Sequence, residues 1–594
     1  MLSYKAPVED MRFVLSELLA DESLETLPGY AEFSPDLADA ILEEAGKICE
    51  NVLFPINRSG DEEGCSYENG VVRTPNGFKE AYQEFIQGGW NGLAADSDFG
   101  GQDVPNTIAN AVQEMICSSN LSFGMYQGLT IGAYHAIHAH GTEEQKLTFL
   151  PKLVEGSWSG TMCLTEPHCG TDLGLIRTRA VKNGNGSYKI TGTKIFISAG
   201  EHDLTANIVH LVLARMPDAP EGIKGISMFL VPKFLPNDDG EAGPRNGVMC
   251  SGIEHKMGIK ASATCVLNFE EATGYLVGEP NKGMRAMFTM MNAARLAVGI
   301  QGLGICESAY QGATSYARER LQGRALKGAK NPDQPADPIL VHPDVRRMLL
   351  TMRAYTEGAR ALVAWVSAKI DVYKRHPDKQ TVSDADDFVS LLTPVVKAML
   401  TDLGTDVANL GVQVLGGQGY IRENGMEQYV RDARIGQIYE GTNGVQAMDL
   451  IGRKLPAHMG RYLKQFFHPV SRYIDDHADD EALAPFIQPL AKAFGRLQRA
   501  TGAVAQKGLK DPNQAAAVAS DYLRLFGLVA FAYLWARMAE ISLAQMEAEN
   551  GRFYRAKVDT AQFFMDRLLP QSGALFSSIM AGGDSTMIFD DEAF

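Results

Sequence analysis

The first candidate for chemistry is a carboxylate, Glu440, which stands beside a glycine and a threonine in Tyr439–Thr442. A positioned carboxylate can act as a general base and remove a weakly acidic proton. A glutamate near a helix start can instead be a structural residue that the helix dipole stabilises. Because the whole stretch Arg431–Ile438 precedes Glu440, we favour the catalytic interpretation.

Two upstream segments could hold a planar cofactor. Cys163–Asp172 combines small residues, hydroxyls and backbone amides, so it can approach a ring edge or a pyrophosphate closely. The same residue types also form ordinary hydrogen-bonded turns. In Gly192–Gly200, the pattern predicts a strand on which Phe196 and Ser198 share a face, because side chains two residues apart point the same way. Phe196 and Ser198 could then flank the cofactor.

A metal centre or a thiol nucleophile is a weaker alternative. His168, Cys169 and Asp172 are the residue types for either, but neighbouring His and Cys side chains do not easily converge on one atom. The eight cysteines show no CxxC pair and no metal-ligand spacing, which is typical of reduced thiols in a cytosolic enzyme. We therefore expect no metal.

The elements that must position these residues change character along the chain. Apolar residues recur every three or four positions in Leu37–Val52, Phe78–Gly88 and Thr107–Ser118, which predicts helices. Short β-rich runs follow Trp158: Tyr188–Ile190, Ile195–Ser198, Ile208–Leu213, Ile226–Val231 and Cys265–Phe269, with a hairpin turn predicted at Asn183–Gly186. Helical periodicity returns in Met284–Arg320, Asp344–Tyr373 and Asp386–Val414, which are long enough for a bundle.

A further helical stretch lies beyond about residue 456. Its expected helices are Ala491–Val504, Ala515–Ala548 and Arg555–Leu568, and Pro469, Pro485 and Pro489 are expected to break the pattern. This stretch is interpreted as an added helical domain. Packing of an oligomer is its favoured role, with membrane attachment as the runner-up.

Composition limits the class of protein. A chain of 594 residues should form two to four domains. The net charge of −17 argues against a general polyanion-binding surface. The start of the chain, Met1–Ala20, lacks the order of a secretory signal, and the apolar run Leu525–Trp535 is too short to span a bilayer. We therefore expect a cytoplasmic protein without a transmembrane helix.

The cofactor segments, a Gly-rich stretch at Gln413–Tyr420 and the Glu440 segment occur in a fixed order. Together with supporting motifs at His140–Lys146 and Lys256–Gly258, this order resembles the acyl-CoA dehydrogenase family over roughly residues 35–455. The resemblance implies an α+β fold: a helical N-terminal domain (1–160), a central β-barrel-like domain (161–280), a helical bundle with the base (281–455) and an extra helical domain (456–594). It also implies FAD, bound between the β domain and the bundle.

The resemblance assigns roles residue by residue, with Glu440 as the catalytic base. The residues that it implies for FAD are Leu164, Thr165, Thr171, Phe196, Ile197, Ser198, Arg320, Gln322, Gln413, Gly416, Gly417, Thr442 and Asn443. For the acyl-CoA it implies Thr171, Asn292, Gly441 and Arg295, with Arg295 at the head of a bundle helix. Arg320 and Gln322 resemble residues that reach the FAD of a neighbouring subunit, so a homo-oligomer is expected, with a dimer favoured.

Three positions bear on this resemblance. Gly323 stands where the family commonly has Phe, and Gly444 stands where it commonly has Gln, which puts the adenine pocket and one flavin-side hydrogen bond in question. Some members take their base from the position just before the CoA-side arginine, which is Ala294 here. Alanine cannot accept a proton, so the assignment of the base to Glu440 is strengthened.

The implied reaction is the FAD-dependent conversion of an acyl-CoA to its trans-2-enoyl-CoA, with an electron-transfer flavoprotein as acceptor. The C-terminal extension resembles that of longer bacterial members, including the 3-methylmercaptopropionyl-CoA dehydrogenase group. We therefore expect 3-methylthiopropanoyl-CoA or a short or medium acyl chain as substrate.

Other functions stay open. A long-chain dehydrogenase and an acyl-CoA oxidase use the same base and flavin. A non-catalytic flavoprotein of the DNA-alkylation-response branch is a further alternative. It is disfavoured because residues 461–594 hold 14 Lys plus Arg against 16 Asp plus Glu, a net charge of −2.

Overall fold

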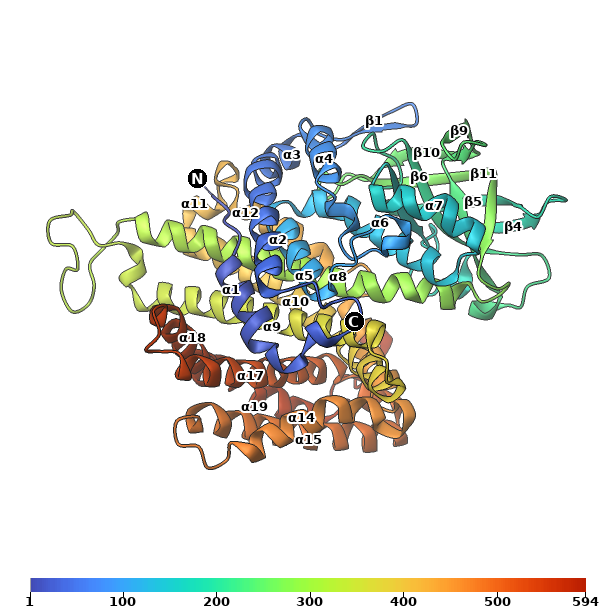
Figure 1. Cartoon of the computed structure of the whole chain (residues 1–594). Helices are drawn as coiled ribbons and strands as arrows, with labels where there is room; N and C mark the ends of the chain where they lie inside the picture. The colour runs from blue at the N-terminus through green and yellow to red at the C-terminus, as the bar shows by residue number, and fades with distance from the viewer. Residues whose placement is uncertain (1) are drawn as a thin grey trace. The chain divides into compact units, whose positions relative to one another are not determined.

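The computed structural model describes residues 2–594, which divide into two compact units (Figure 1). The helical unit comprises the chain up to Glu44, Pro105–Glu114 and Val298–Phe594, and the sheet unit comprises Ala45–Val104 and Met115–Ala297. The division falls within three helices: α2 (Pro35–Ile48), α5 (Asn106–Ser119) and α8 (Gly283–Glu319).

The sheet unit is built on a seven-stranded sheet. Its strands are β3 (Trp158–Cys163), β4 (Arg179–Lys182), β5 (Tyr188–Ser198), β6 (Asn207–Arg215), β7 (Ile226–Pro232), β10 (Val248–Ile253) and β11 (Thr264–Val277). β5, β4, β6, β7 and β11 each pair with two neighbours in turn, so these five strands close a ring. The expected barrel-like β domain is therefore confirmed.

Local sequence explains how these strands connect and pack. The predicted turn at Asn183–Gly186 joins the antiparallel strands β4 and β5, and the Asn183 N–H donates to the Ser187 carbonyl at 2.7 Å. Gly160 in β3 lets helix α6 (Leu121–His140) approach closely, because a Cβ on Gly160 would lie 2.3 Å from the Cβ of Ala133. The unit also contains the α-helices and strands α3 (Asn57–Glu63), β1 (Ser66–Glu68), β2 (Val71–Arg73), α4 (Phe78–Gln87), α7 (Glu143–Glu155), β8 (Phe234–Pro236) and β9 (Ala242–Arg245).

The helical unit contains the expected bundle and the added helical domain. Its helices are α1 (Val8–Arg12), α9 (Pro343–Arg375), α10 (Lys379–Leu415), α11 (Gly417–Tyr420), α12 (Met426–Arg434), α13 (Asn443–Asp449), α14 (Arg461–Asp476), α15 (Ala484–Lys510), α16 (Pro512–Ala516), α17 (Ala519–Ala544), α18 (Gly551–Phe563) and α19 (Gln571–Ala581). In Figure 1 the orange and red helices α14, α15, α17, α18 and α19 gather in one group, in which α17 packs against α15, α18 and α19.

Three expectations about this region are wrong. Pro469 and Pro489 lie inside α14 and α15 and do not end them. Burial of the flanking Phe466 and Val470 on the apolar face of α14 outweighs the hydrogen bond that Pro469 cannot make. The single helix expected at Ala515–Ala548 is instead two, α16 and α17, with a break at residues 517–518.

Two helices, α10 and α17, are long and apolar enough to cross a membrane by length and composition. Their most apolar windows are 78% and 83% buried inside the protein, which is how core helices behave. They are weak evidence for a membrane span.

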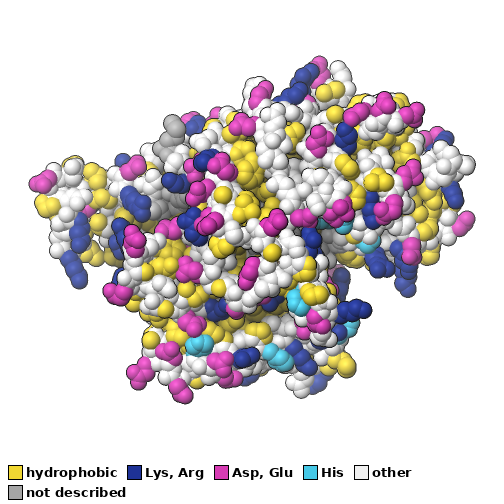
Figure 2. All heavy atoms as spheres, in the orientation of Figure 1, with side chains coloured by type: hydrophobic (Ala, Val, Ile, Leu, Met, Phe, Trp, Pro, Cys, Tyr) yellow, Lys and Arg dark blue, Asp and Glu magenta, His cyan; other side chains and the backbone are white. Residues whose placement is uncertain are grey.

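The face in Figure 2 shows acidic and basic side chains interspersed over its surface.

A buried charge cluster ties the two ends of the helical unit to its bundle. Arg360 of α9 pairs with Asp10, Glu114 and Glu307, and the fully buried Lys557 of α18 pairs with Asp10 and, at 2.7 Å, with Glu357. Burial raises the pKa of Asp10, but Lys557 and Arg360 outweigh this effect and bring it to about 2. Burial raises the pKa of Glu114 to about 7. The docking of the C-terminal domain therefore depends on paired charges.

The raised pKa of Glu114 predicts how stability depends on pH. The folded protein holds this proton above the ordinary pKa of 4.5, so Glu114 makes stability fall as pH rises from about 4.5 to about 7, by up to about 1.4 kcal/mol per pH unit. In Glu114→Gln, the melting temperature should fall less from pH 5 to pH 7 than it does in the wild type. The exposed Glu32→Gln is the control, and an unchanged pH dependence in Glu114→Gln would contradict the assignment.

Candidate active site

Glu440 lies in the helical unit, in a sharp turn just before α13. Thr442 caps this helix, because its hydroxyl accepts a hydrogen bond from the Val445 N–H at 3.3 Å. Glu440 and Gly441 before it both have left-handed backbones, with φ of +55° and +82°. A non-glycine residue in this region costs roughly 1–2 kcal/mol. The surroundings must therefore hold Glu440 in place.

Two buried side chains donate hydrogen bonds to the carbonyls of this turn. Nε2 of Gln446 donates to the carbonyl oxygens of Glu440 at 3.0 Å and Gly441 at 3.2 Å. Nζ of Lys397, on α10, donates to the same Gly441 oxygen at 2.8 Å. Lys397 and Gln446 are both 0% exposed, whereas Glu440 is half-buried.

Asn443 fastens the same turn to α10. Its Oδ1 accepts from Lys397 at 2.9 Å, and its Nδ2 donates to Oδ1 of Asp402 at 2.7 Å. Oδ1 of Asp402 also accepts from Nε2 of Gln437 at 2.7 Å. Residues on both sides of Glu440 are thus bonded to one helix, which fixes the segment that carries the predicted base.

In the sheet unit, a buried ion pair organises the predicted cofactor loop. The Glu166 carboxylate accepts from the backbone N–H groups of Arg177 at 2.7 Å and Thr178 at 3.0 Å, and from Nζ of Lys194 at 2.8 Å. Nζ of Lys194 also donates to the Leu164 carbonyl at 2.9 Å. Burial raises the pKa of Glu166, but Lys194 and these hydrogen bonds leave it below its ordinary value.

Strand β5 contains a bulge at the second predicted cofactor segment. Its partner β11 pairs Cys265 with Ile197 but Leu267 with Lys194, so β5 has one residue more over this span. Phe196, at the bulge, has φ +58° and is 59% exposed, while Ile197 is buried and Ser198 is half-buried. Because the bulge interrupts the regular alternation of side chains, the shared face of Phe196 and Ser198 stays a prediction.

The structure brings the loop and the strand together, because the Ile195 N–H donates to the Thr165 carbonyl at 2.9 Å. Leu164 and Thr165 are half-buried and Thr171 is exposed. An exposed aromatic ring, an aliphatic side chain and several hydroxyls therefore lie on connected segments. This combination of apolar and hydroxyl groups fits a flat, amphipathic ring system such as a flavin.

The expectation that His168 and Cys169 cannot approach a common point is wrong. Ligand atoms of Glu166, His168 and Cys169 lie within 4.8 Å of one another, because the Glu166 and Cys169 backbones pair across a tight turn. The carboxylate nevertheless already accepts from Lys194, and Nε2 of His168 lies 2.9 Å from the Leu175 carbonyl oxygen. These groups have partners within the protein.

Arg320 and Gln322 follow α8 in the helical unit, and both are exposed. The loop after them is organised by the buried Asp337, whose carboxylate accepts the N–H groups of Ala325, Lys330 and Asn331. These hydrogen bonds lower the pKa of Asp337 to about 2. Gly323 has φ +72°, so the Phe that the family commonly has there would be strained.

The remaining predicted residues lie at helix ends or along α8. Gln413, Gly416 and Gly417 are exposed at the end of α10, and a Cβ on either glycine would meet no atom within 4 Å. Along α8, Asn292 is exposed and Arg295 is 7% exposed. The expectation that Arg295 lies at the head of its helix is wrong. Helix α8 begins at Gly283, so Arg295 lies inside it.

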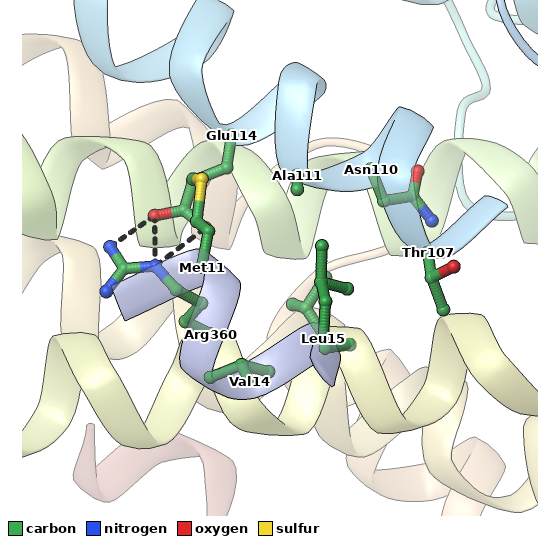
Figure 3. A pocket seen from close by; sticks show the side chains of 10 residues that line it. Met11, Val14, Leu15, Thr107, Asn110, Ala111, Glu114 and Arg360 are labelled. Carbon is green, nitrogen blue, oxygen red and sulfur yellow. Dashed lines mark hydrogen bonds and ion pairs between the residues drawn. The ribbon is translucent and has the colours of Figure 1, made fainter. Parts of the chain in front are cut away.

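A pocket lies elsewhere in the helical unit (Figure 3). Leu15 and Asn110 are among its lining residues, and Glu114 and Arg360 of the charge cluster lie at one side. None of the predicted site residues lines it. Because Arg360 is already paired with three carboxylates, we interpret this pocket as part of the packing between helices.

Family models cover most of the chain. The N-terminal, middle and C-terminal domain models of acyl-CoA dehydrogenase match residues 36–157, 161–272 and 281–455, and a model described as "Acetyl-CoA dehydrogenase C-terminal like" matches 466–590. The chain belongs to the acyl-CoA dehydrogenase family. It is thus an oxidoreductase of the class that acts on CH–CH groups.

Individual members of the acyl-CoA dehydrogenase family match along the whole chain. 3-Methylmercaptopropionyl-CoA dehydrogenase of Ruegeria pomeroyi is 43% identical, covering 99% of both chains. Broad-specificity linear acyl-CoA dehydrogenase FadE5 of Mycobacterium tuberculosis is 34% identical, covering 100% of both. A solved acyl-CoA dehydrogenase from Bacillus anthracis, complexed with FAD, is 21% identical and shares the fold, with a TM-score of 0.74 over 97% of this chain and 92% of its own. These full-length matches are named as dehydrogenases, which favours an enzyme over the non-catalytic alternative.

Sequence reasoning missed the buried polar groups that support the acyl-CoA dehydrogenase site. Lys397 and Gln446 hold the Glu440 turn, and Glu166 and Lys194 hold the predicted cofactor loop. One signal was available, since Lys397 interrupts an apolar run of the expected helix Asp386–Val414. A charged residue at a core position of a helix needs a buried partner.

The Lys194–Glu166 pair generates a stability prediction for this acyl-CoA dehydrogenase. Lys194→Met should cost about 3–5 kcal/mol, because it leaves the Glu166 carboxylate buried without its cation. Adding Glu166→Gln should recover part of the loss. The measurement is the melting temperature.

Lys189→Met on the same strand is the matched control. Lys189 also lies 2.6 Å from a carboxylate, that of Glu271, but the two side chains are 46% and 68% exposed. This surface pair should contribute at most about 1 kcal/mol. Equal melting temperatures for Lys194→Met and Lys189→Met would contradict our account of the loop.

Proposed function

We propose that this protein catalyses the FAD-dependent α,β-dehydrogenation of an acyl-CoA thioester, with Glu440 as the base. The observation that carries the proposal is the Glu440 turn, in which buried donors hold a half-buried carboxylate in a left-handed backbone. Backbone strain that the surroundings maintain is typical of functional sites. Within this family, removal of the α-proton is the task that needs a fixed carboxylate.

The chain's own residues supply the acid–base part of the reaction. The α-proton of a thioester is weakly acidic, so it must meet a positioned base while donors stabilise the charge that develops on the thioester oxygen. The Glu440 carboxylate takes the proton, and the backbone N–H of Glu440 is proposed as one of the donors. Asn292, Arg295, Thr171 and Gly441 are proposed to contact the acyl-CoA.

When bound, FAD would supply the acceptor for the hydride of the β-carbon. Leu164, Thr165, Thr171 and Phe196–Ser198 are proposed to hold the flavin ring region, together with Thr442 and Asn443. Gln413, Gly416 and Gly417 are proposed for the adenosine side, where the backbone is exposed and open. The solved Bacillus anthracis relative with FAD has this fold, which supports the cofactor assignment.

Arg320 and Gln322 are proposed to complete the FAD site of a second copy of the chain. Their exposure and the preformed loop anchored by Asp337 support this role. The protein is accordingly proposed to be a homodimer in the cytoplasm that passes electrons to an electron-transfer flavoprotein. No metal is part of the proposed site. The domain boundaries near residues 160, 280 and 455 are likewise proposed.

For the substrate we propose 3-methylthiopropanoyl-CoA or a short or medium straight-chain acyl-CoA. The 43% identical relative is named for a 3-methylmercaptopropionyl thioester, and a 32% identical relative from Syntrophomonas wolfei, covering 99% of its own length, is named butyryl-CoA dehydrogenase. A thioether sulfur is apolar and roughly replaces a methylene, so one pocket should accept both kinds of chain.

Removal of the base predicts a specific loss. Glu440→Gln should retain yellow FAD but reduce the rate of anaerobic flavin bleaching by butanoyl-CoA by about 10²–10⁴-fold, because the amide cannot accept the proton. The exposed Glu423→Gln in the same unit is the control and should bleach like the wild type. Bleaching of Glu440→Gln at the wild-type rate would refute the assignment of the base.

A chain-length series tests the substrate. Values of kcat/KM with one electron acceptor should be highest for butanoyl- and 3-methylthiopropanoyl-CoA, lower for octanoyl-CoA and lowest for palmitoyl-CoA. The decline should be graded, because a single methylene discriminates by only about 1–3 kcal/mol. If palmitoyl-CoA gives the highest value, the proposal of a short-chain substrate is wrong and the long-chain alternative takes its place.

A further inference from the structure

The buried Lys397 of α10 donates hydrogen bonds to the Glu440 turn. Neither the sequence motifs nor the family resemblance assigns it a role. Its Nζ lies 2.8 Å from the Gly441 carbonyl oxygen and 2.9 Å from Oδ1 of Asn443. These acceptors are 44 and 46 residues away in the sequence. A fully buried ammonium is unfavourable unless it is hydrogen-bonded. A lysine at this position of α10 therefore indicates a specific role.

We propose that Lys397 is a positioning residue that fixes the direction of the Glu440 carboxylate. The inference rests on the proposed function of Glu440 as the base. Each carbonyl oxygen belongs to a rigid peptide plane. Gln446 holds the plane after Glu440, while Lys397 and Gln446 hold the plane after Gly441. With both planes held, the left-handed φ of +82° at Gly441 is fixed, and Glu440, with its own left-handed φ of +55°, is held on its C-terminal side.

The charge of Lys397 matters as well as its reach. A hydrogen bond from an ionised donor is roughly twice as strong as one between neutral groups. Gln446 supplies neutral donors to the same turn, and its Oε1 is buried without a hydrogen-bond partner among the described residues. Lys397 is therefore the stronger of the two donors to the Gly441 carbonyl oxygen, while Asn443 links the ammonium to Asp402 and the rest of α10.

The test compares FAD-loaded Lys397→Met with the wild type. The limiting rate of anaerobic flavin reduction by butanoyl-CoA should fall at least tenfold, while the Kd for butanoyl-CoA should change less than threefold. The amides of the 438–446 segment should also exchange with deuterium at least tenfold faster in the variant. This second readout does not depend on activity.

Thr393→Val is the matched control. Thr393 lies one turn earlier on α10, is 6% exposed and donates within its own helix, to the Val389 carbonyl at 2.7 Å. It should leave the reduction rate and the exchange of residues 438–446 as in the wild type. If Lys397→Met does not fold, Lys397→Gln replaces it, since a shorter, neutral donor cannot reach both acceptors.

The outcomes separate the two proposals. Reduction within twofold of the wild-type rate, together with unchanged exchange, overturns the role of Lys397 even if the melting temperature falls. A fall shared equally by Thr393→Val also overturns it, because the effect would be a general one on α10. If butanoyl-CoA and the other thioesters do not bleach the wild type, the proposed function fails. Exchange at residues 438–446 then decides alone whether Lys397 holds the turn.

Discussion

The structure depends on a constraint at one residue: Glu440 must occupy a left-handed backbone that its side chain disfavours. The cost of roughly 1–2 kcal/mol is small beside the hydrogen bonds that Lys397, Gln446 and Asn443 make around it. These donors are effective only if α10 is correctly placed. The packing that places α10 therefore helps to hold the Glu440 carboxylate.

The sheet unit uses the same physical device. Lys194, fully buried, donates to the Leu164 carbonyl and pairs with Glu166, just as the fully buried Lys397 donates to the Gly441 carbonyl and bonds to Asn443. In each unit a buried ammonium reaches the backbone of a segment proposed to meet substrate or cofactor. A buried charge specifies one geometry, because moving it away from its acceptors leaves it unpaired.

Local signals predicted the parts of the fold that depend on local patterns. The helix expected at Met284–Arg320 and the turn at Asn183–Gly186 were found almost as expected, because long apolar periodicity and Asn-Gly turns act over short distances. The break between α16 and α17 and the left-handed Glu440 were missed. The Glu440 turn depends in part on a contact between distant residues, since Lys397 is 44 residues from Gly441. The family motifs identified the candidate residues but not the groups that support them.

In the proposed function, the fold places the Glu440 carboxylate where it can remove the α-proton. A crystal structure with FAD and a non-oxidisable acyl-CoA analogue measures this directly, as the distance from the carboxylate oxygen to the α-carbon. Our account predicts about 3–3.5 Å, the separation of a near-attack geometry, with the Lys397 bond to Gly441 intact. A carboxylate turned away from the α-carbon, with another base within about 3.5 Å of it, would contradict the account.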